Sequence, residues 1–130
     1  MVAPSEFMLA VSYNPGYQSV LKDLKPSTRQ RFIALSFDYP DLEREADIVV
    51  REGDVEKNLA RLLVKLAHMT RSLKDSGLPE GASTRLLIQA GKLMAKGIPA
   101  RTACRVAITG PLTDDPELLA AIDEMVSSLF

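Results

Sequence analysis

An amide and three guanidinium groups are the side chains of this sequence whose positions suggest chemistry. Asn14 lies in a turn after one apolar run, and Arg29 and Arg31 stand just before a second one. Arg85 follows later, at the expected start of a helix. An amide at a strand tip can orient a water toward a γ-phosphate, and a guanidinium can stabilise charge on a transferring phosphoryl group. In this order, the four residues indicate phosphoryl chemistry.

Each of these residues also has a plainer interpretation. Asn14 fits an ordinary Asn-Pro-Gly turn. Arg29 and Arg31 fit a solvated surface, and residues two apart on a helix point in different directions, so the two do not share one role. Arg31 is better placed to reach a neighbouring subunit, which leaves Arg29 either to contact that subunit or to reach the same phosphate. Arg85 opposes the helix dipole in a first turn, which favours an anionic target; the alternative is an exposed arginine.

The remaining candidates favour structural roles. His68 has no second histidine to join it and is expected at the edge of the core, so no metal site is predicted. Cys104, the one cysteine, is expected to be a small buried hydrophobic residue in a reducing compartment. A solvated helix face is expected from the acidic residues Asp41, Glu43, Glu45 and Asp47. Either a small basic strip or ordinary surface charge is expected from Lys92, Lys96, Arg101 and Arg105.

Length and composition disfavour several classes of protein. With 130 residues, the chain holds one domain, or one domain and a fragment. Its net charge of −1 and an acidic last helix argue against a small helical nucleic-acid binder. No apolar stretch approaches the roughly 18–20 residues of a membrane span, and the N-terminus lacks the pattern of a secretory signal. A cytoplasmic protein is therefore expected.

Two apolar runs predict β-strands near the N-terminus. Residues 6–13 and 32–37 are continuous apolar stretches, which at this length favour strands covered on both faces. Two strands alone make a marginal sheet, and they come before any helix that could cover them, so further chain upstream is expected. Without it, unpaired strand edges predict self-association through residues 7–13 or 32–37, or local disorder there.

The rest of the sequence predicts a bundle of about five helices, because apolar residues recur at helical spacing between polar caps and breakers. The expected ranges are 40–51, 54–73, 83–96, 99–108 and 113 to the C-terminus. Gly53 is expected to end the first helix and Asp54 to cap the second. The dipeptide Gly110-Pro111 is expected to break the fourth helix, and Thr113 or Asp114 to cap the last.

These segments together resemble the CbbQ/NirQ/NorQ family of MoxR-type AAA+ ATPases. The stretches that carry the resemblance are Ser12-Tyr13-Asn14-Pro15-Gly16-Tyr17-Gln18, Lys22-Asp23-Leu24-Lys25-Pro26-Ser27-Thr28-Arg29-Gln30-Arg31-Phe32 and Gly81-Ala82-Ser83-Thr84-Arg85. The resemblance implies that Asn14 is sensor 1, that Arg31, alone or with Arg29, is the arginine finger, and that Arg85 is sensor 2. It also implies a mainly α fold: residues 1–39 are the C-terminal end of an incomplete AAA+ α/β core with two strands, and residues 40–130 are the helical lid.

The resemblance further implies partners and cofactors. Family members form rings, usually hexameric, pair with a protein that carries a von Willebrand factor A domain, and remodel a metalloenzyme. The known target enzymes are nitric oxide reductase, which is matured, and Rubisco, which is activated. This sequence does not indicate which of the two is the target. ATP and Mg are implied for the intact parent protein. This chain holds no Gly-rich loop with Lys-Ser or Lys-Thr and no strand ending in paired acids, so neither cofactor nor ATP hydrolysis is expected of the chain alone.

One alternative function comes from a different class. The chain would then be a stand-alone helical protein-interaction module without nucleotide chemistry, and its arginines would dock on a neighbouring protein. Co-purification with a full-length ATPase would favour this alternative.

Overall fold

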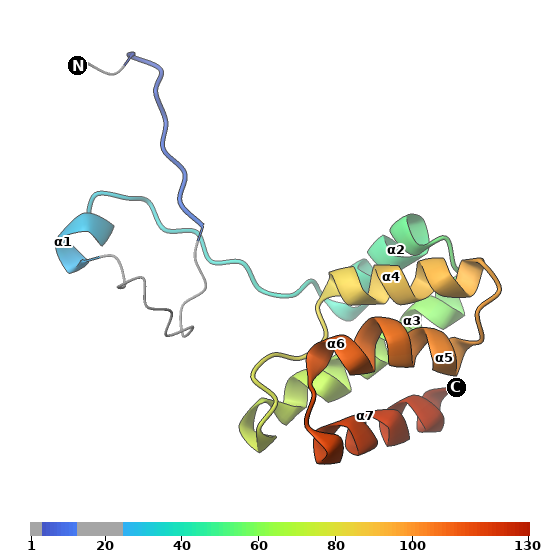
Figure 1. The fold of residues 1–130 in the computed structure, drawn as a ribbon. Coiled ribbons are helices and arrows are strands. Elements are labelled where there is room, and N and C mark those ends of the chain that lie inside the picture. The colour runs from blue at the N-terminus through green and yellow to red at the C-terminus, as the bar shows by residue number, and fades with distance from the viewer. Residues whose placement is uncertain (1–3, 13–24) are drawn as a thin grey trace. The chain divides into compact units, whose positions relative to one another are not determined.

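The computed structural model describes residues 4–12 and 25–130, and Asn14 lies outside them. The chain divides into two units, Met1–Ser36 and Phe37–Phe130, and each is described by itself. We call the second unit the helical unit (Figure 1).

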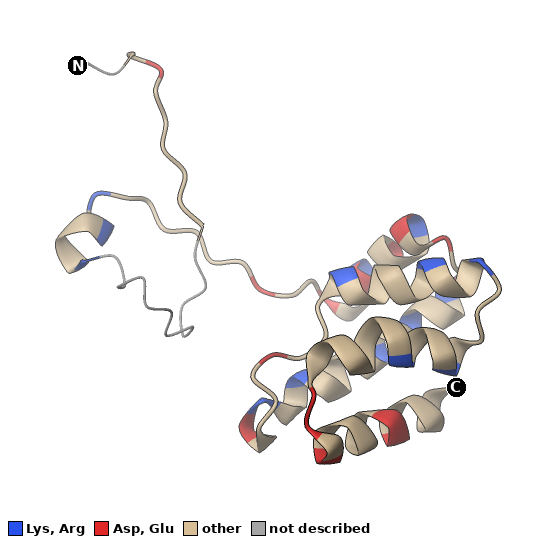
Figure 2. Cartoon of the chain, viewed as in Figure 1, with Lys and Arg blue, Asp and Glu red and all other residues tan. Residues whose placement is uncertain are grey.

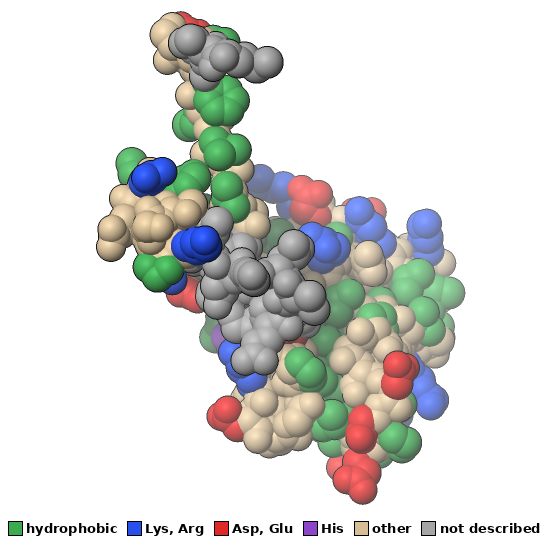
Figure 3. Space-filling view, turned by 60° about the vertical axis from the view of Figure 1, so that its left-hand side comes forward, with side chains coloured by type: hydrophobic (Ala, Val, Ile, Leu, Met, Phe, Trp, Pro, Cys, Tyr) green, Lys and Arg blue, Asp and Glu red, His purple; other side chains and the backbone are tan. Residues whose placement is uncertain are grey.

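In the first unit, the described residues contain one short helix and no strand. The helix α1 (Pro26–Arg29) begins with its proline, and residues 4–12 and 30–36 contain only turns, bends and irregular segments. The predicted strands over 6–13 and 32–37 are therefore wrong for the part of the chain that the structure describes. Their apolar side chains are exposed instead, as Figure 3 shows along residues 4–12, and Ile33 is 93% exposed. A strand is held by hydrogen bonds to a neighbouring strand, and neither run has one among the described residues.

The helical unit confirms the mainly α fold and the predicted succession of helical segments. The elements are α2 (Leu42–Gly53), α3 (Lys57–Arg71), η1 (Ser72–Ser76), α4 (Thr84–Ala95), α5 (Ala100–Cys104), η2 (Arg105–Thr109), α6 (Gly110–Leu112) and α7 (Pro116–Leu129). The helix α2 packs against α3 and α4. The continuous stretch α5–η2–α6 lies between α4 on one side and α7 on the other (Figure 1). The helices enclose one core, whose largest fully buried apolar side chains include Leu63, Leu66, Leu87, Ile108 and Ile122.

The structure shifts several helix ends from their predicted positions. The helix α2 begins after Asp41, whose Oδ1 accepts a hydrogen bond of 3.0 Å from the backbone N–H of Arg44. Asp54 does not cap α3; it ends α2 in the left-handed conformation, with φ of 56°. Asp115, rather than Thr113 or Asp114, caps α7, because its Oδ1 accepts from two backbone N–H groups of the first turn at 2.9 and 3.1 Å.

The predicted break at Gly110-Pro111 is also wrong. The helix continues as a π-helical segment, η2, and then as α6 to Leu112. The switch from π to α geometry at Gly110 places Pro111 in the first turn of a new α segment, where its missing N–H costs least. A proline therefore does not end the helix here.

Two small residues bring α2 and α4 close together. A Cβ atom added to Gly91 would lie 3.2 Å from the Cα atom of Gly53, so the two backbones nearly touch at this crossing. Cys104 lies in the same core, fully buried as the sequence predicts. Burial raises the pKa of its thiol to about 12, so the thiol stays protonated.

Candidate functional site

The carboxylate of Glu45 is enclosed between three helical segments. Its side chain is fully buried, and Arg71 of α3 donates two hydrogen bonds to it, from Nη1 to Oε2 at 2.8 Å and from Nη2 to Oε1 at 2.7 Å. The hydroxyl of Thr84, the first residue of α4, donates to Oε1 at 2.7 Å. Glu45 therefore ties α2 to both α3 and α4.

This burial corrects the prediction of a solvated acidic face. Asp41, Glu43 and Asp47 are exposed as predicted, but Glu45 is not. Glu45 lies four residues before the buried Val49, on the side of α2 that faces the core. The helical spacing to Val49 is the signal in the sequence that could have found it.

The guanidinium of Arg71 has three partners: Glu45, Ala82 and Tyr39. Besides its two bonds to Glu45, Nε donates to the carbonyl of Ala82 at 2.9 Å. The ring of Tyr39 stacks on it, with 3.5 Å from the ring centroid to Cζ. The Arg71 side chain is only 12% exposed, so the charge is held by the carboxylate, the carbonyl and the aromatic face. We call Tyr39, Glu45, Arg71 and Thr84 the Glu45 network.

Glu45 is ionised in this setting. Burial alone would raise the pKa of its carboxyl group, but the hydrogen bonds from Arg71 and Thr84 and the charge of Arg71 together lower the pKa below its ordinary value of 4.5. The network therefore holds an ion pair at neutral pH.

The lowered pKa of Glu45 predicts a pH-dependent stability. Because the folded-state pKa lies below the unfolded one, ionised Glu45 stabilises the fold above about pH 4.5, and this contribution is lost as the pH falls through the folded-state pKa. We expect Glu45→Gln to flatten the fall of the unfolding free energy of the chain between about pH 5 and 3. Urea unfolding at four pH values measures this pH dependence of the unfolding free energy. Glu52→Gln is the control, since Glu52 is an exposed acid on the same helix and makes no ion pair among the described residues. Parallel curves for Glu45→Gln and the unmodified chain would contradict the prediction.

The segment that leads into α4 is held against α3. A Cβ atom added to Gly81 would lie 2.4 Å from the Cα atom of Arg71, so only glycine fits there without a shift. The backbone N–H of Ala82 donates to Oγ1 of Thr70 at 3.0 Å, and the Thr70 hydroxyl donates to the carbonyl of Ala67 at 2.8 Å. The start of α4 is therefore fixed in place before Arg85 is reached.

Arg85 lies in the first turn of α4, as predicted, and is exposed. Its neighbour Thr84 points inward to Glu45. Within the part of the chain that the structure describes, Arg85 makes no ion pair. An outward guanidinium on a fixed helix start can receive an anion without rearrangement of the backbone.

The other predicted site residues belong to the first unit of the chain. Asn14 is not among the described residues. Arg29 is the last residue of α1, Arg31 lies just beyond it, and both are exposed. Arg85 belongs to the second unit, and each unit is described by itself.

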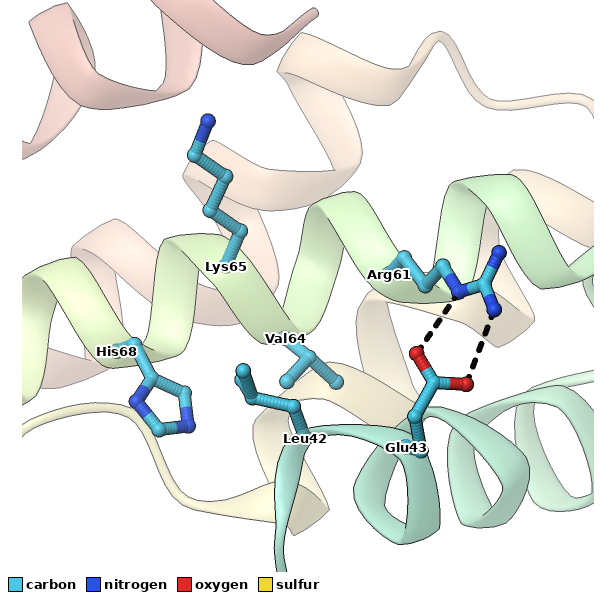
Figure 4. A pocket seen from close by; sticks show the side chains of 6 residues that line it. All are labelled: Leu42, Glu43, Arg61, Val64, Lys65 and His68. Carbon is cyan, nitrogen blue, oxygen red and sulfur yellow. Dashed lines mark hydrogen bonds and ion pairs between the residues drawn. The ribbon is translucent and has the colours of Figure 1, made fainter.

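A surface pocket of about 450 Å³ lies between the start of α2 and α3 (Figure 4). The pair Glu43–Arg61 forms one side, with bonds of 3.1 and 3.0 Å, and Leu42 and Val64 line it. The ring of His68 lies beside Leu42, so this histidine is exposed at a pocket. The pocket contains none of the predicted site residues. Among residues 4–12 and 25–130 no group of three or more His, Cys, Asp or Glu side chains is arranged to hold a metal ion.

Charges on the last helices are separated by sign. Figure 2 shows only basic residues on α4 and α5 and only acidic ones on α7. Of the four residues of the possible basic strip, Lys92 and Lys96 are exposed, and Arg105 pairs with Asp123 at 3.5 Å. Arg101 donates to the carbonyl of Ser127 at 3.5 Å. Within the described residues, no helix has both the length and the apolar character needed to cross a membrane.

Comparison with known proteins places the chain in a family. The denitrification regulatory protein NirQ of Pseudomonas aeruginosa is 55% identical over 124 residues, which are 95% of this chain and 48% of NirQ. Protein CbbQ of Hydrogenophilus thermoluteolus is 50% identical over 98% of this chain and 48% of its own length. Protein NorQ of Paracoccus denitrificans is 46% identical over 95% of this chain and 46% of its own. The chain thus spans about half the length of these relatives. The profile of the CbbQ/NirQ/NorQ C-terminal family matches residues 45–129, and the chain therefore belongs to that family.

Proposed function

We propose that this chain is the C-terminal part of a MoxR-type AAA+ ATPase that remodels or activates a metalloenzyme, and that Arg85 contacts the nucleotide phosphates as sensor 2. The observation that supports this most is the outward Arg85 on a helix start that buried contacts hold in place. A cation in a first helical turn opposes the dipole, which a bound anion would offset. Family membership supports the assignment, and one relative is named as a regulator of denitrification.

The remaining roles follow from the same proposal. Asn14 acts as sensor 1, and Arg31, alone or with Arg29, acts as the finger that reaches a neighbouring subunit of a hexameric ring. Another part of the intact protein supplies the phosphate-binding loop and the Mg site. The partner is a protein with a von Willebrand factor A domain, and the target is a metalloenzyme such as nitric oxide reductase or Rubisco.

Arg85→Ala in the full-length protein tests the proposal. We expect ATP affinity to fall by about 10- to 100-fold, since a hydrogen bond to a charged group is worth about 1.5–3 kcal/mol. Titration with a fluorescent ATP analogue measures the affinity. Lys92→Ala is the matched control, because Lys92 is an exposed cation on the same helix. Equal affinities of Arg85→Ala and the unmodified protein would refute the role of Arg85.

A second measurement separates the ATPase from the interaction module. The isolated chain should bind no MgATP, and stoichiometric tight binding would contradict the view that the other half of the protein is needed. Sequencing the gene upstream of the codon for Ala3 should reveal an in-frame phosphate-binding loop. An unrelated reading frame there would instead favour the interaction module.

A further inference from the structure

We propose that Glu45, Arg71 and Thr84 are positioning residues for Arg85, and that Tyr39 connects them to the segment that joins the two units. This inference rests on the proposed function of Arg85. It assigns a role to a buried ion pair that would otherwise be a purely structural feature of the helical unit.

The first step is the orientation of the first turn of α4. Ser83, the residue before α4, makes no side-chain capping bond, so the usual device that fixes a helix start is not used here. The bond from Thr84 to Glu45 at 2.7 Å takes its place. Successive helical residues are turned by about 100°, so fixing Thr84 toward the core directs Arg85 to solvent.

The second step is the support beneath that turn. Arg71 holds Glu45 through two bonds, and its Nε also holds the carbonyl of Ala82, three residues before Arg85. Gly81 lies directly against the backbone of Arg71. The same guanidinium therefore fixes both the carboxylate that receives Thr84 and the segment that leads into α4.

The third step is the link to the chain junction. Tyr39 lies between the end of the first unit at Ser36 and the start of α2, and its ring stacks on Arg71 at 3.5 Å. Tyr39 is 49% exposed, so the stack is at the edge of the network. A displacement of residues 37–40 would be transmitted to Arg71 and from there to the start of α4. The position of Arg85 is thereby coupled to the junction.

A double-mutant cycle in the full-length protein tests this inference. Thr84→Val removes the hydroxyl bond to Glu45 while keeping the shape of the side chain. We expect it to lower ATP affinity by about 3- to 10-fold, in line with one lost hydrogen bond. In the Arg85→Ala background the same change should leave affinity unaltered, because the residue it positions is gone. The unfolding midpoint should shift equally in both backgrounds.

The outcomes are distinguishable. If Arg85→Ala alone has no effect on affinity, the proposed function fails. If Arg85→Ala lowers affinity but Thr84→Val does not, or lowers it equally in both backgrounds, the positioning role is wrong while the proposed function stands. For the junction, Tyr39→Leu should lower the ATP affinity. Tyr39→Phe should keep the affinity of the unmodified protein, because phenylalanine retains the aromatic face. Equal affinities of these two variants would overturn the role of Tyr39.

Discussion

Replacing Arg71 with methionine should destabilise the helical unit by about 3–5 kcal/mol. The change leaves the Glu45 carboxylate buried without its cation, and the cost of an unpaired buried charge is much larger than the net worth of the pair. Arg71→Met also removes the bond to Ala82 and the stack on Tyr39. Urea unfolding of the full chain at neutral pH, followed by circular dichroism, measures the loss.

The chain offers a matched control for this prediction. Arg61 also makes two bonds to a carboxylate, that of Glu43, but the two side chains are 53% and 61% exposed. An exposed pair contributes at most about 1 kcal/mol, so Arg61→Met should cost little. Replacing both Glu45 and Arg71 with methionine should recover part of the loss, because no buried charge is left unpaired. Equal losses for Arg71→Met and Arg61→Met would show that Glu45 is not buried as described.

Gly81→Ala should destabilise the chain by about 3 kcal/mol. The added Cβ atom would lie 2.4 Å from the Cα atom and 2.5 Å from the backbone nitrogen of Arg71, and backbone atoms cannot rotate away as a flexible side chain can. The segment before α4 would have to move off α3, which would weaken the bonds of Ala82 to Thr70 and Arg71. The thermal or urea unfolding midpoint measures the effect.

Two other glycines serve as controls for that substitution. Gly77 has φ of 96° and open space around it, so Gly77→Ala should cost only the left-handed backbone term of about 1–2 kcal/mol. At Gly110, which is helical, the new atom would meet only the Arg105 carbonyl at 3.4 Å, so Gly110→Ala should be neutral or slightly stabilising. A Gly81→Ala chain as stable as Gly110→Ala would mean that the segment does not lie against Arg71.

Periodicity in the sequence was sufficient to predict the helical unit. The apolar positions of α3 and α7 recur at helical spacing, and a core follows from that spacing with no knowledge of partners. Helix ends were less certain, because a capping side chain can serve one helix or the next. Asp54 is such a residue. Its side chain is of the type that caps the start of a helix such as α3, but in the structure it ends α2 in the left-handed conformation.

The Glu45 network could not have been found in this way. Its ion pair joins residues 26 positions apart, and although the spacing to Val49 places Glu45 on the core side of α2, nothing local identifies Arg71 as its partner. The two apolar runs near the N-terminus show the opposite limit. Their composition favours buried strands, but burial needs other segments to pair with and to cover them, and those segments are not among the described residues. The place of Arg85 in a first helical turn was predictable because it follows from where α4 begins.

Alkylation of Cys104 can report how often the core of the helical unit opens. Cys104 is the one cysteine of the sequence, and its thiol is sealed in the core with a pKa near 12. An alkylating reagent reacts with the thiolate, so in mildly alkaline solution it labels only molecules in which the core has opened and the pKa has returned to normal. The rate at which the mass of the chain increases then reports the fraction of molecules with an open core, and no denaturant is needed. The stabilities of the variants made in this chain can be ranked by their labelling rates under native conditions.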